Sequence, residues 1–535
     1  MPTILWRLCG IMEKIKSLFR RRYLVIFSLL FSFSIVNSRI FAKQIGFCTF
    51  GRLMGAIGIV LLIFPFVLMG VCLFVDKVNI SVSTNDEDDC KTTARRTAFA
   101  SFVVLFLIHK IFFWATFPGI CYYDLGTQIE QYDSWKIIDN HPIIHTLILG
   151  FLKNLFENAN TGYAIATIIQ LIVVEISMSF TVYYCYCRTR SIILVLVTLL
   201  FYGVHPVNVL LSLSTTKDIL FSGMFLISYI CMRLLLEGEQ NHHGIGYILV
   251  FSLTISILFR NNAKYALVLA IPFAILFLYN KTIIRKKYME IVIICVISLV
   301  VSCAINKATF AKVNAVSGSI KEMLSIPAQE LGRLANSDVD NETQETIHEY
   351  ISDVSLYTYY LADPMKRQLP FDGFVSKCKH FLFDSVILNI KYPIVCMDAI
   401  LCNTQGYWDI VHCPYSSERF YLMPEAGAYR GGATLESKNN RLTDYLITAY
   451  NSTKPYEDKL CIILLNPALY IWLFILAFVV ALQNKQMERA FAGIFPICYL
   501  LTLLMGPGAI IRYAFWFILA APISVMDVHW HIHYK

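Results

Sequence analysis

The feature that most constrains the fold is a series of apolar runs of roughly 15–25 residues that recurs from Tyr23 to Met526. A helix needs a run of this length to cross about 30 Å of hydrocarbon. Of the 535 residues, 57% are hydrophobic and only 15% are charged, whereas a soluble protein carries about 25% charged residues. A soluble fold would have to bury about a dozen apolar helices in one core. We therefore predict an all-α polytopic membrane protein.

We expect about twelve membrane-spanning helices, because a lipid-exposed backbone must satisfy its hydrogen bonds internally. No small-residue cleavage site follows the first apolar run, so we expect this run to be retained as a span and not removed as a signal peptide. The expected spans are residues 23–38, 54–75, 98–116, 162–186, 191–205, 216–235, 245–259, 265–280, 289–306, 460–482, 489–506 and 510–527.

Basic clusters between the apolar runs predict the orientation in the membrane. They include Arg20–Arg22, Arg95 and Arg96, Arg188 and Arg190, Arg285–Lys287, and Lys485 with Arg489. The positive-inside rule places such clusters on the cytoplasmic face. Both termini are then cytoplasmic, and residues 117–145 and 307–459 are extracytoplasmic in a cell membrane. Because the net charge of +8 is dispersed and forms no single stripe, it does not indicate nucleic-acid binding.

The expected organisation follows from these spans. Residues 1–22 form a cytoplasmic basic segment, 23–306 an N-terminal transmembrane bundle, 307–459 an extracytoplasmic domain, 460–527 C-terminal transmembrane helices and 528–535 a cytoplasmic tail. The 307–459 segment is long enough for a small domain. Its periodicity predicts helices over Ile320–Ala335 and Glu342–Ala362, and the glycines and prolines from Gly406 onward predict loops.

Titratable residues are concentrated in the loop at 117–145. Charged groups beside a bilayer are costly, so they are functional candidates by default. Asp124 follows the helix-breaking pair Pro118-Gly119 and could act as a general base; the alternative is an ordinary solvated carboxylate. The other acidic and histidine residues of the loop are Glu130, Asp133, Asp139, His141 and His145.

The two histidines are a second candidate within that loop. On a helix beginning at Pro142, His141 and His145 would share one face. They could donate hydrogen bonds to a phosphate or hold a metal, or they could simply be interfacial side chains. No third ligand occurs at a fixed spacing, so the metal stays unknown, with a divalent cation as one alternative.

Further cations are predicted at the extracytoplasmic ends of spans. Lys217 and Asp218 begin a span and could bind a phosphate at its helix N-terminus, or Asp218 could cap the helix while Lys217 snorkels. Arg260, and Arg512 with Tyr513, are unusual at this face under the positive-inside rule. An anionic lipid headgroup is their expected partner.

Two further features are structural candidates. His109 and Lys110 fall inside a span and should face the bundle interior, with Glu175 as a candidate partner of the pair. Cys402 and Cys413 lie in the expected extracytoplasmic segment, where a disulfide is one alternative.

In their order along the chain, these motifs resemble a known family. Phe117-Pro-Gly, Asp124, His141-Pro, Lys217-Asp218, Arg260-Asn-Asn and Arg512-Tyr513 are similar to those of uncharacterised bacterial multi-pass membrane proteins. That family is similar in layout to GT-C glycosyltransferases, such as protein mannosyltransferases and the lipid A aminoarabinose transferase. The resemblance covers residues from about 100 to 527.

The resemblance implies a function. It identifies the chain as an integral membrane glycosyltransferase that transfers a sugar from a polyprenyl-phosphate donor to a cell-envelope glycan, lipid or protein on the extracytoplasmic face. Asp124 would be the catalytic base, with Glu130 or Asp218 as a second acid. His141, His145, Lys217, Asp218, Arg260, Arg512 and Tyr513 would contact the substrate. The aromatic rings of Gly406-Tyr407-Trp408-Asp409 would be available to stack on a sugar.

Two other functions compete with this interpretation. A lipid-linked glycan polymerase or ligase would also place basic residues outside, although its key loop normally falls late in the chain. A multi-pass transporter would show repeated halves and functional charges near the bilayer midplane. The sequence shows no repeat, and its unusual charges gather at one predicted face.

Overall fold

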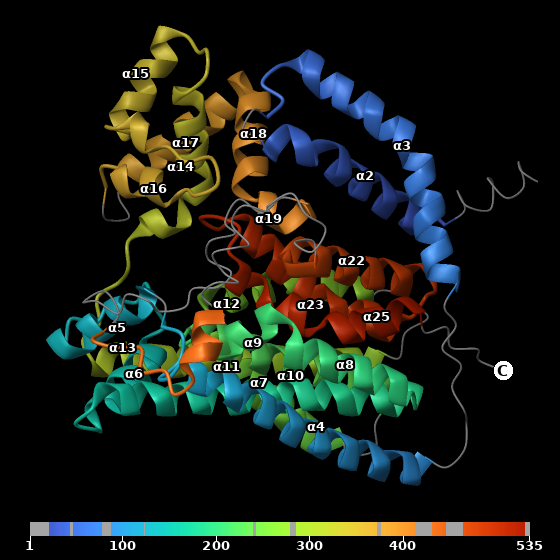
Figure 1. Cartoon of the computed structure of the whole chain (residues 1–535). Helices are drawn as coiled ribbons and strands as arrows, with labels where there is room; N and C mark the ends of the chain where they lie inside the picture. Colours follow the sequence, from blue (N-terminus) through green and yellow to red (C-terminus); the bar gives the residue numbers. More distant parts are fainter. Residues whose placement is uncertain are drawn as a thin grey trace, which may run out of the picture.

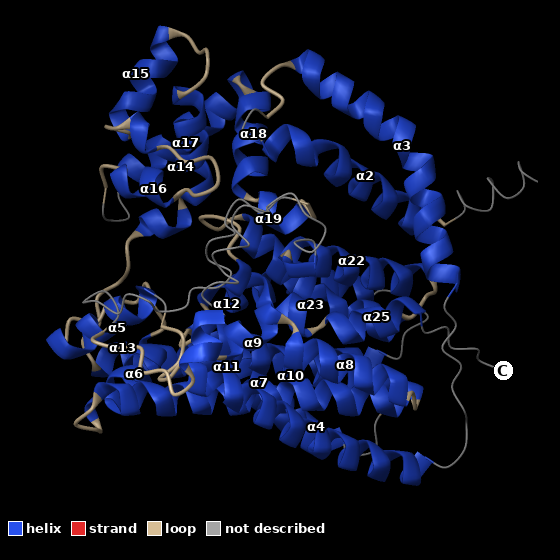
Figure 2. Cartoon of the chain, in the orientation of Figure 1, coloured by secondary structure: helices blue, strands red, loops and turns tan. Residues whose placement is uncertain are grey.

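The computed structural model describes residues 21–42, 46–77, 87–121, 123–238, 242–278, 285–371, 376–411, 431–445 and 464–529. Within these ranges the chain is helical (Figure 2), and its only β interactions are isolated bridges. This all-helical architecture confirms the all-α part of the predicted fold class. It is the architecture in which each membrane segment satisfies its own backbone hydrogen bonds.

Helices account for most of the described residues. In chain order they are α2 (Arg22–Ala42), α3 (Phe50–Lys77), α4 (Glu87–Ala115), α5 (Tyr123–Ser134), α6 (Ile143–Asn154), α7 (Ala159–Thr189), α8 (Ile192–Val204), α9 (Pro206–Ser212), α10 (Lys217–Glu237), α11 (His242–Phe259), α12 (Asn261–Leu278), α13 (Arg285–Lys312), η1 (Ile320–Met323), α14 (Ser325–Ala335), α15 (Asn341–Tyr350), η2 (Val354–Leu356), α16 (Asp363–Gln368), α17 (Ser376–Lys391), α18 (Pro393–Asn403), α19 (Gln405–Trp408), α22 (Pro467–Gln483), α23 (Met487–Leu504), η6 (Ile511–Ala514), α24 (Phe515–Leu519) and α25 (Ala521–His529).

Seven described helices are long and apolar enough to cross a membrane, and the number rises to ten if each of three bent pairs is one span. The chain is thus compatible with a multi-pass membrane protein. The expected number of twelve is not reached. Expected spans 23–38, 245–259 and 460–482 correspond to α2, α11 and α22, whose candidate apolar stretches, Arg22–Ser38, His243–Phe259 and Pro467–Gln483, are each shorter than 18 residues. The expected span at 191–205 continues past Pro206 into α9 with a bend of 58°.

The bundle is built around α10, which is buried along almost its whole length. It packs against α7, α11, α23 and α24, and its aromatic side chains, such as Phe225, contact Phe495 and Trp516. A helix that is apolar all round is expected at such a central position. Figure 1 shows α7, α10, α11 and α23 lying side by side, with α5 and α6 at one end of the bundle.

The first two helices, α2 and α3, do not join the N-terminal part of the bundle. They form a hairpin that packs against α22 and α25 near the other end of the chain (Figure 1). Phe27 and Phe31 of α2 contact the ring of Trp472 in α22. These aromatic contacts join segments that are more than 400 residues apart in sequence.

Helices α14–α18 form a separate layer with its own core of Leu331, Ile347, Met365 and Phe381. The predicted helix over Glu342–Ala362 ends earlier, at Tyr350. The reason is that Asp353 accepts a hydrogen bond from Ser355 N and so caps the short helix η2, which competes with continuation of α15. Cys402 is buried, and Cys413 lies outside the described residues.

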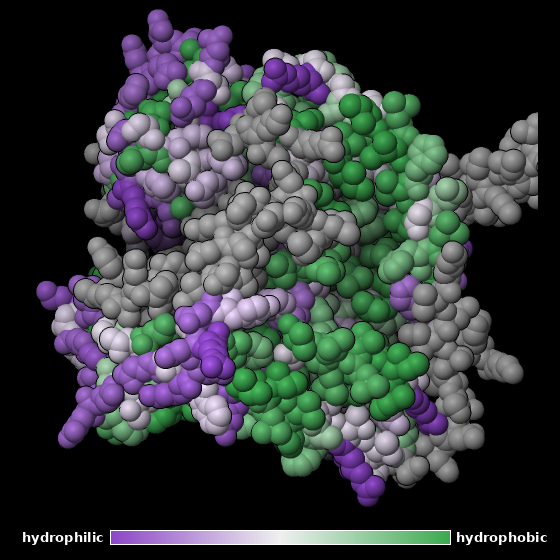
Figure 3. Space-filling model, in the orientation of Figure 1, coloured by the Kyte–Doolittle hydropathy of each residue, from purple (hydrophilic) through white to green (hydrophobic). Residues whose placement is uncertain are grey.

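The surface in Figure 3 is divided between hydrophobic and hydrophilic regions. Hydrophobic side chains cover α3 and the part of the bundle around α8, whereas hydrophilic ones gather over α15 and over the end of the bundle formed by α5 and α6. Within the bundle, His109 is fully buried and its Nδ1 lies 3.0 Å from Glu175 Oε1. The expectation for Lys110 was wrong: this side chain is exposed and lies over the ring of Trp114.

Candidate functional site

The loop after α4 places Asp124 beside the start of α10. Ile120 N donates a hydrogen bond to Leu213 O, and Thr215 N donates one to Ile120 O, each at 2.9 Å. These bonds fix the two loops to each other. As a result Lys217 Nζ, in the first turn of α10, lies 2.7 Å from Asp124 Oδ2, in the first turn of α5.

A second cation contacts the same carboxylate oxygen. Arg512 Nη1 lies 3.0 Å from Asp124 Oδ2. Arg512 sits on η6, and the loop before it is held in place because Ile510 N donates to Tyr407 Oη, which itself donates to Gly508 O at 3.3 Å. One oxygen of Asp124 therefore receives two positive charges, from positions 93 and 388 residues away.

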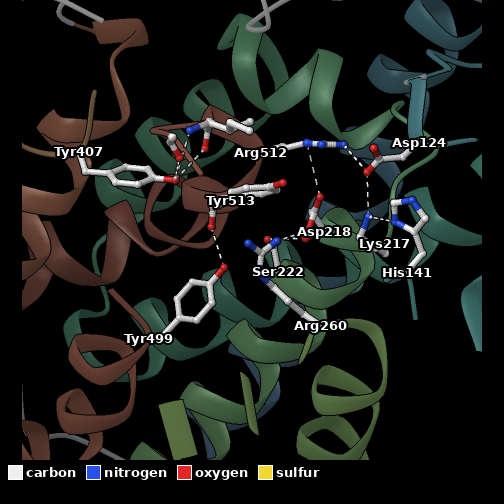
Figure 4. Close-up of polar contacts among 12 residues, drawn as sticks. Asp124, His141, Lys217, Asp218, Ser222, Arg260, Tyr407, Tyr499, Arg512 and Tyr513 are labelled. Carbon is white, nitrogen blue, oxygen red and sulfur yellow. Dashed lines mark hydrogen bonds and ion pairs between the residues drawn. The ribbon is translucent and has the colours of Figure 1, made fainter. Parts of the chain in front are cut away.

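Asp218 continues this chain of charges into the bundle. Its side chain is completely buried, its Oδ2 lies 3.6 Å from Arg512 Nε, and its Oδ1 pairs with Arg260 Nη1. Arg260 also lies over the ring of Tyr513, at 4.2 Å from the ring centroid. Figure 4 shows Asp124, Lys217, Arg512, Asp218 and Arg260 converging from four separate parts of the chain. We call these five residues the charged cluster.

His141 lies at the edge of the charged cluster, where Lys217 Nζ is 3.1 Å from its Nδ1. Burial and the adjacent Lys217 charge lower the pKa of His141 to about 4, so this imidazole is neutral at physiological pH. A neutral Nδ1 can accept a hydrogen bond from the lysine ammonium. Lys217 thereby links the histidine to Asp124.

Burial alone would raise the pKa of Asp124, but the charges of Arg512 and Lys217 hold it well below its usual range. The group is therefore ionised. Three cations face two carboxylates in the charged cluster, which leaves one surplus positive charge when His141 is neutral. An uncompensated charge in a buried site is unfavourable, so the cluster favours an additional anion.

Two of the predicted site residues are placed elsewhere. Glu130 is on the exposed face of α5 and does not join the charged cluster. His145 is buried behind it, 3.0 Å from Gln128 Nε2 and in contact with the ring of Phe259. The α-helical spacing put His141 and His145 on one face, but the helix α6 begins only at Ile143, so the two rings have different surroundings.

Sequence reasoning did not identify the residues that support the charged cluster. Tyr499 donates a hydrogen bond to Tyr513 O at 2.8 Å, and its ring lies under Arg260. A tyrosine inside an apolar run is normally interpreted as a core residue, so the sequence contained no signal that Tyr499 belongs to the site. Tyr407 is almost completely buried, and its hydroxyl supports the Arg512 loop, so its ring is not available for the predicted sugar stacking.

Among the described residues, no group of three or more His, Cys, Asp or Glu side chains is placed to hold a metal ion. Asp124 and Asp218 are each paired with cations. The polar groups of the site are therefore suited to an anion.

Comparison with known proteins gives one match. The model of DUF6020, described as a family of unknown function, matches residues 133–533. This region includes every residue of the charged cluster except Asp124. No curated protein and no solved structure matches the chain.

Proposed function

The chain belongs to DUF6020, a family of unknown function, and we propose from its site that it is an integral membrane glycosyltransferase. In this proposal, the charged cluster binds the phosphate of a polyprenyl-phosphate sugar, and the sugar passes to a hydroxyl of a cell-envelope glycan, lipid or protein. The reaction takes place on the extracytoplasmic face of the cell membrane. The resemblance to GT-C enzymes in the order of the motifs supports the same function.

The observation that carries the proposal is the pairing of Lys217 and Arg512 with a single oxygen of Asp124. It puts cations and a carboxylate within a few ångströms, as transfer from a phosphate leaving group requires. The donor is a phosphodiester with one negative charge, which would balance the one surplus positive charge of the cluster. Arginine suits this role because its planar guanidinium can donate two hydrogen bonds to a phosphate.

The chemistry is a displacement at the anomeric carbon of the sugar. The acceptor oxygen forms a bond to this carbon, the bond from the carbon to the phosphate oxygen breaks, and the acceptor proton passes to Asp124. The departing polyprenyl phosphate gains a second negative charge. Lys217, Arg260 and Arg512 stabilise that charge, and such preorganised stabilisation is usually a large catalytic contribution.

The resting geometry restricts when Asp124 can act as a base. While Lys217 and Arg512 both contact Asp124, its low pKa makes it a poor proton acceptor. A bound phosphate would compete for the same two cations. If Lys217 and Arg512 moved partly from Asp124 to the phosphate, the pKa of Asp124 would rise. We therefore propose that donor binding itself activates the base.

The test is turnover of a donor. Purified full-length protein is incubated with a panel of polyprenyl-phosphate sugars labelled in the sugar, together with envelope extract as acceptor. We expect release of polyprenyl phosphate with one member of the panel. The turnover rate of Arg512→Ala should be about 100-fold lower than that of the wild type, or lower still. Arg367→Ala, at an exposed position in α16, is the matched control. Equal turnover by Arg512→Ala and Arg367→Ala would contradict the proposal.

A further inference from the structure

A furrow between α12 and α13 is separate from the charged cluster. Its polar end is a hollow of about 180 Å³ lined by Asn261 and Lys264 of α12 and by Ser302, Asn306 and Lys307 of α13. No acidic side chain lines this hollow. Lys264 Nζ lies over the ring of Tyr265, but within the described ranges neither lysine takes part in an ion pair, so no carboxylate balances the two positive charges of the hollow.

The same two helices also line a second, apolar hollow, and we take the two hollows together as one furrow. This narrower hollow, of about 40 Å³, is bounded by Leu267 and Ala274 of α12 and by Cys295 and Leu299 of α13, and also by Met232 of α10 and Phe491 of α23. The lining residues of α12 are spaced three or four positions apart, at Lys264, Leu267, Ile271 and Ala274. This is the spacing of a single helix face. The furrow therefore changes from cationic to apolar along its length.

The length of the furrow fits one leaflet of a membrane. Ten residues separate Lys264 from Ala274, which corresponds to about 15 Å along a helix. This is half of the roughly 30 Å hydrocarbon thickness of a bilayer. A chain lying in the furrow would thus reach about the bilayer midplane, as an acyl chain of one leaflet does.

The furrow faces the membrane and not the charged cluster. Arg260, which immediately precedes α12, is directed to Asp218 and Tyr513. By contrast, Val296 of α13, which lines the apolar part of the furrow, is 43% exposed. Apolar side chains exposed to this degree on candidate spans are expected to contact lipid.

We propose that this furrow binds one anionic phospholipid. Lys264 and Lys307 hold the phosphate of the headgroup, Asn261 and Asn306 donate hydrogen bonds to its oxygens, and one acyl chain lies against Leu267, Ile271 and Ala274 of α12. An amphiphile with a negative head matches both ends of the furrow, and a free phosphate would leave the apolar end empty. This inference does not depend on the transferase activity.

The experiment counts retained lipids by native mass spectrometry of the purified full-length protein, after exchange with phosphatidylglycerol, phosphatidylcholine or a polyprenyl phosphate. We expect preferential retention of phosphatidylglycerol. Lys307→Gln should weaken this binding about fivefold, and Lys264→Gln combined with Lys307→Gln about thirtyfold, at roughly 1 kcal/mol for each lysine. Ala274→Phe should weaken binding without removing the preference for an anionic head.

Lys312→Gln is the matched control, because Lys312 is exposed five residues beyond Lys307 on α13 and does not line the furrow. Its binding should equal that of the wild type. Unchanged phosphatidylglycerol binding in the double lysine variant, or equal retention of phosphatidylcholine, would overturn the proposal. Displacement of phosphatidylglycerol by a smaller amount of polyprenyl phosphate would also overturn it, because the furrow would then belong to an isoprenoid lipid.

Discussion

At the scale of single residues, the attraction between opposite charges in the charged cluster offsets the unfavourable free energy of burying them. Asp218 is completely buried, and Arg512 is 1% exposed. Removing one partner from such a pair leaves a buried charge without compensation and typically costs about 3–5 kcal/mol. Each member of the cluster therefore contributes to stability as well as to any chemistry, and variants need a folding control.

The pH dependence of stability should come from His141 in the mildly acidic range. Its pKa is lowered to about 4 in the folded chain, against about 6.5 when unfolded. Because this pKa is lowered on folding, the contribution of His141 to stability is complete above pH 6.5 and is lost as the pH falls toward 4. Asp124, whose pKa is lowered from near 4, loses its contribution only at still lower pH.

We therefore expect the free energy of unfolding in detergent to fall by about 1–3 kcal/mol between pH 6.5 and 4.5 through His141. In His141→Gln, whose side chain does not titrate, this part of the decline should disappear. Thermal unfolding followed at several pH values measures both proteins. An equally steep decline in His141→Gln would show that other groups are responsible.

At the scale of elements, the loop before α5 determines much of the geometry of the site. The loop at 117–121 places Asp124, and it can pack closely only because residue 119 is a glycine. Gly119 has φ = +130°, and a Cβ there would collide with Oγ1 of Thr167 in α7. Glycine populates this backbone region without the steric cost that other residues incur.

Gly119→Ala should accordingly destabilise the protein by about 1–3 kcal/mol and reduce donor turnover, because it displaces the loop that carries Asp124. Gly58→Ala is the control, since a Cβ at Gly58 in α3 has no atom within 4 Å. Thermal unfolding and turnover are measured together. A Gly119→Ala protein as stable and active as Gly58→Ala would show that the loop tolerates the change.

At the scale of the whole molecule, the sequence predicts the helical class well and the contacts between helices poorly. Apolar length alone identified α4, α7 and α10, since each must be long enough to cross a membrane. It could not show that α2 and α3 pack against α22 and α25, because lipid-facing and helix-facing apolar side chains look alike. It also could not show bends such as that between α8 and α9.

The site was predictable to a similar extent. Lys217, Arg260 and Arg512 stood out as cations at one predicted face, and the structure brings them together with Asp124 and Asp218. Which cation pairs with which carboxylate depends on loops that no local pattern encodes. The spacing of Glu130 suggested a solvated face, and the structure places it on the exposed face of α5, whereas Asp124 on the same helix is buried.

The predicted orientation has its own test. Cysteines introduced at Asp133 and at Asn341, both exposed, should react with an impermeant thiol reagent in intact cells above the level of the parent protein. A cysteine at Lys286, in the first turn of α13, should react only after permeabilisation. Labelling at Lys286 alone in intact cells would reverse the topology and place the charged cluster on the cytoplasmic face.

The most direct measurement is the initial rate of sugar transfer by Asp124→Asn compared with Asp133→Asn. Asp133 lies in the same helix but is exposed and paired with Lys153, and such surface pairs contribute little. The account predicts that Asp124→Asn, which removes the proton acceptor but keeps the size of the side chain, lowers the rate by about 10²–10⁴. Asp133→Asn should remain near the wild-type rate. Near-normal transfer by a folded Asp124→Asn protein, in an assay where Arg512→Ala is inactive, would contradict the assignment of Asp124 as the base.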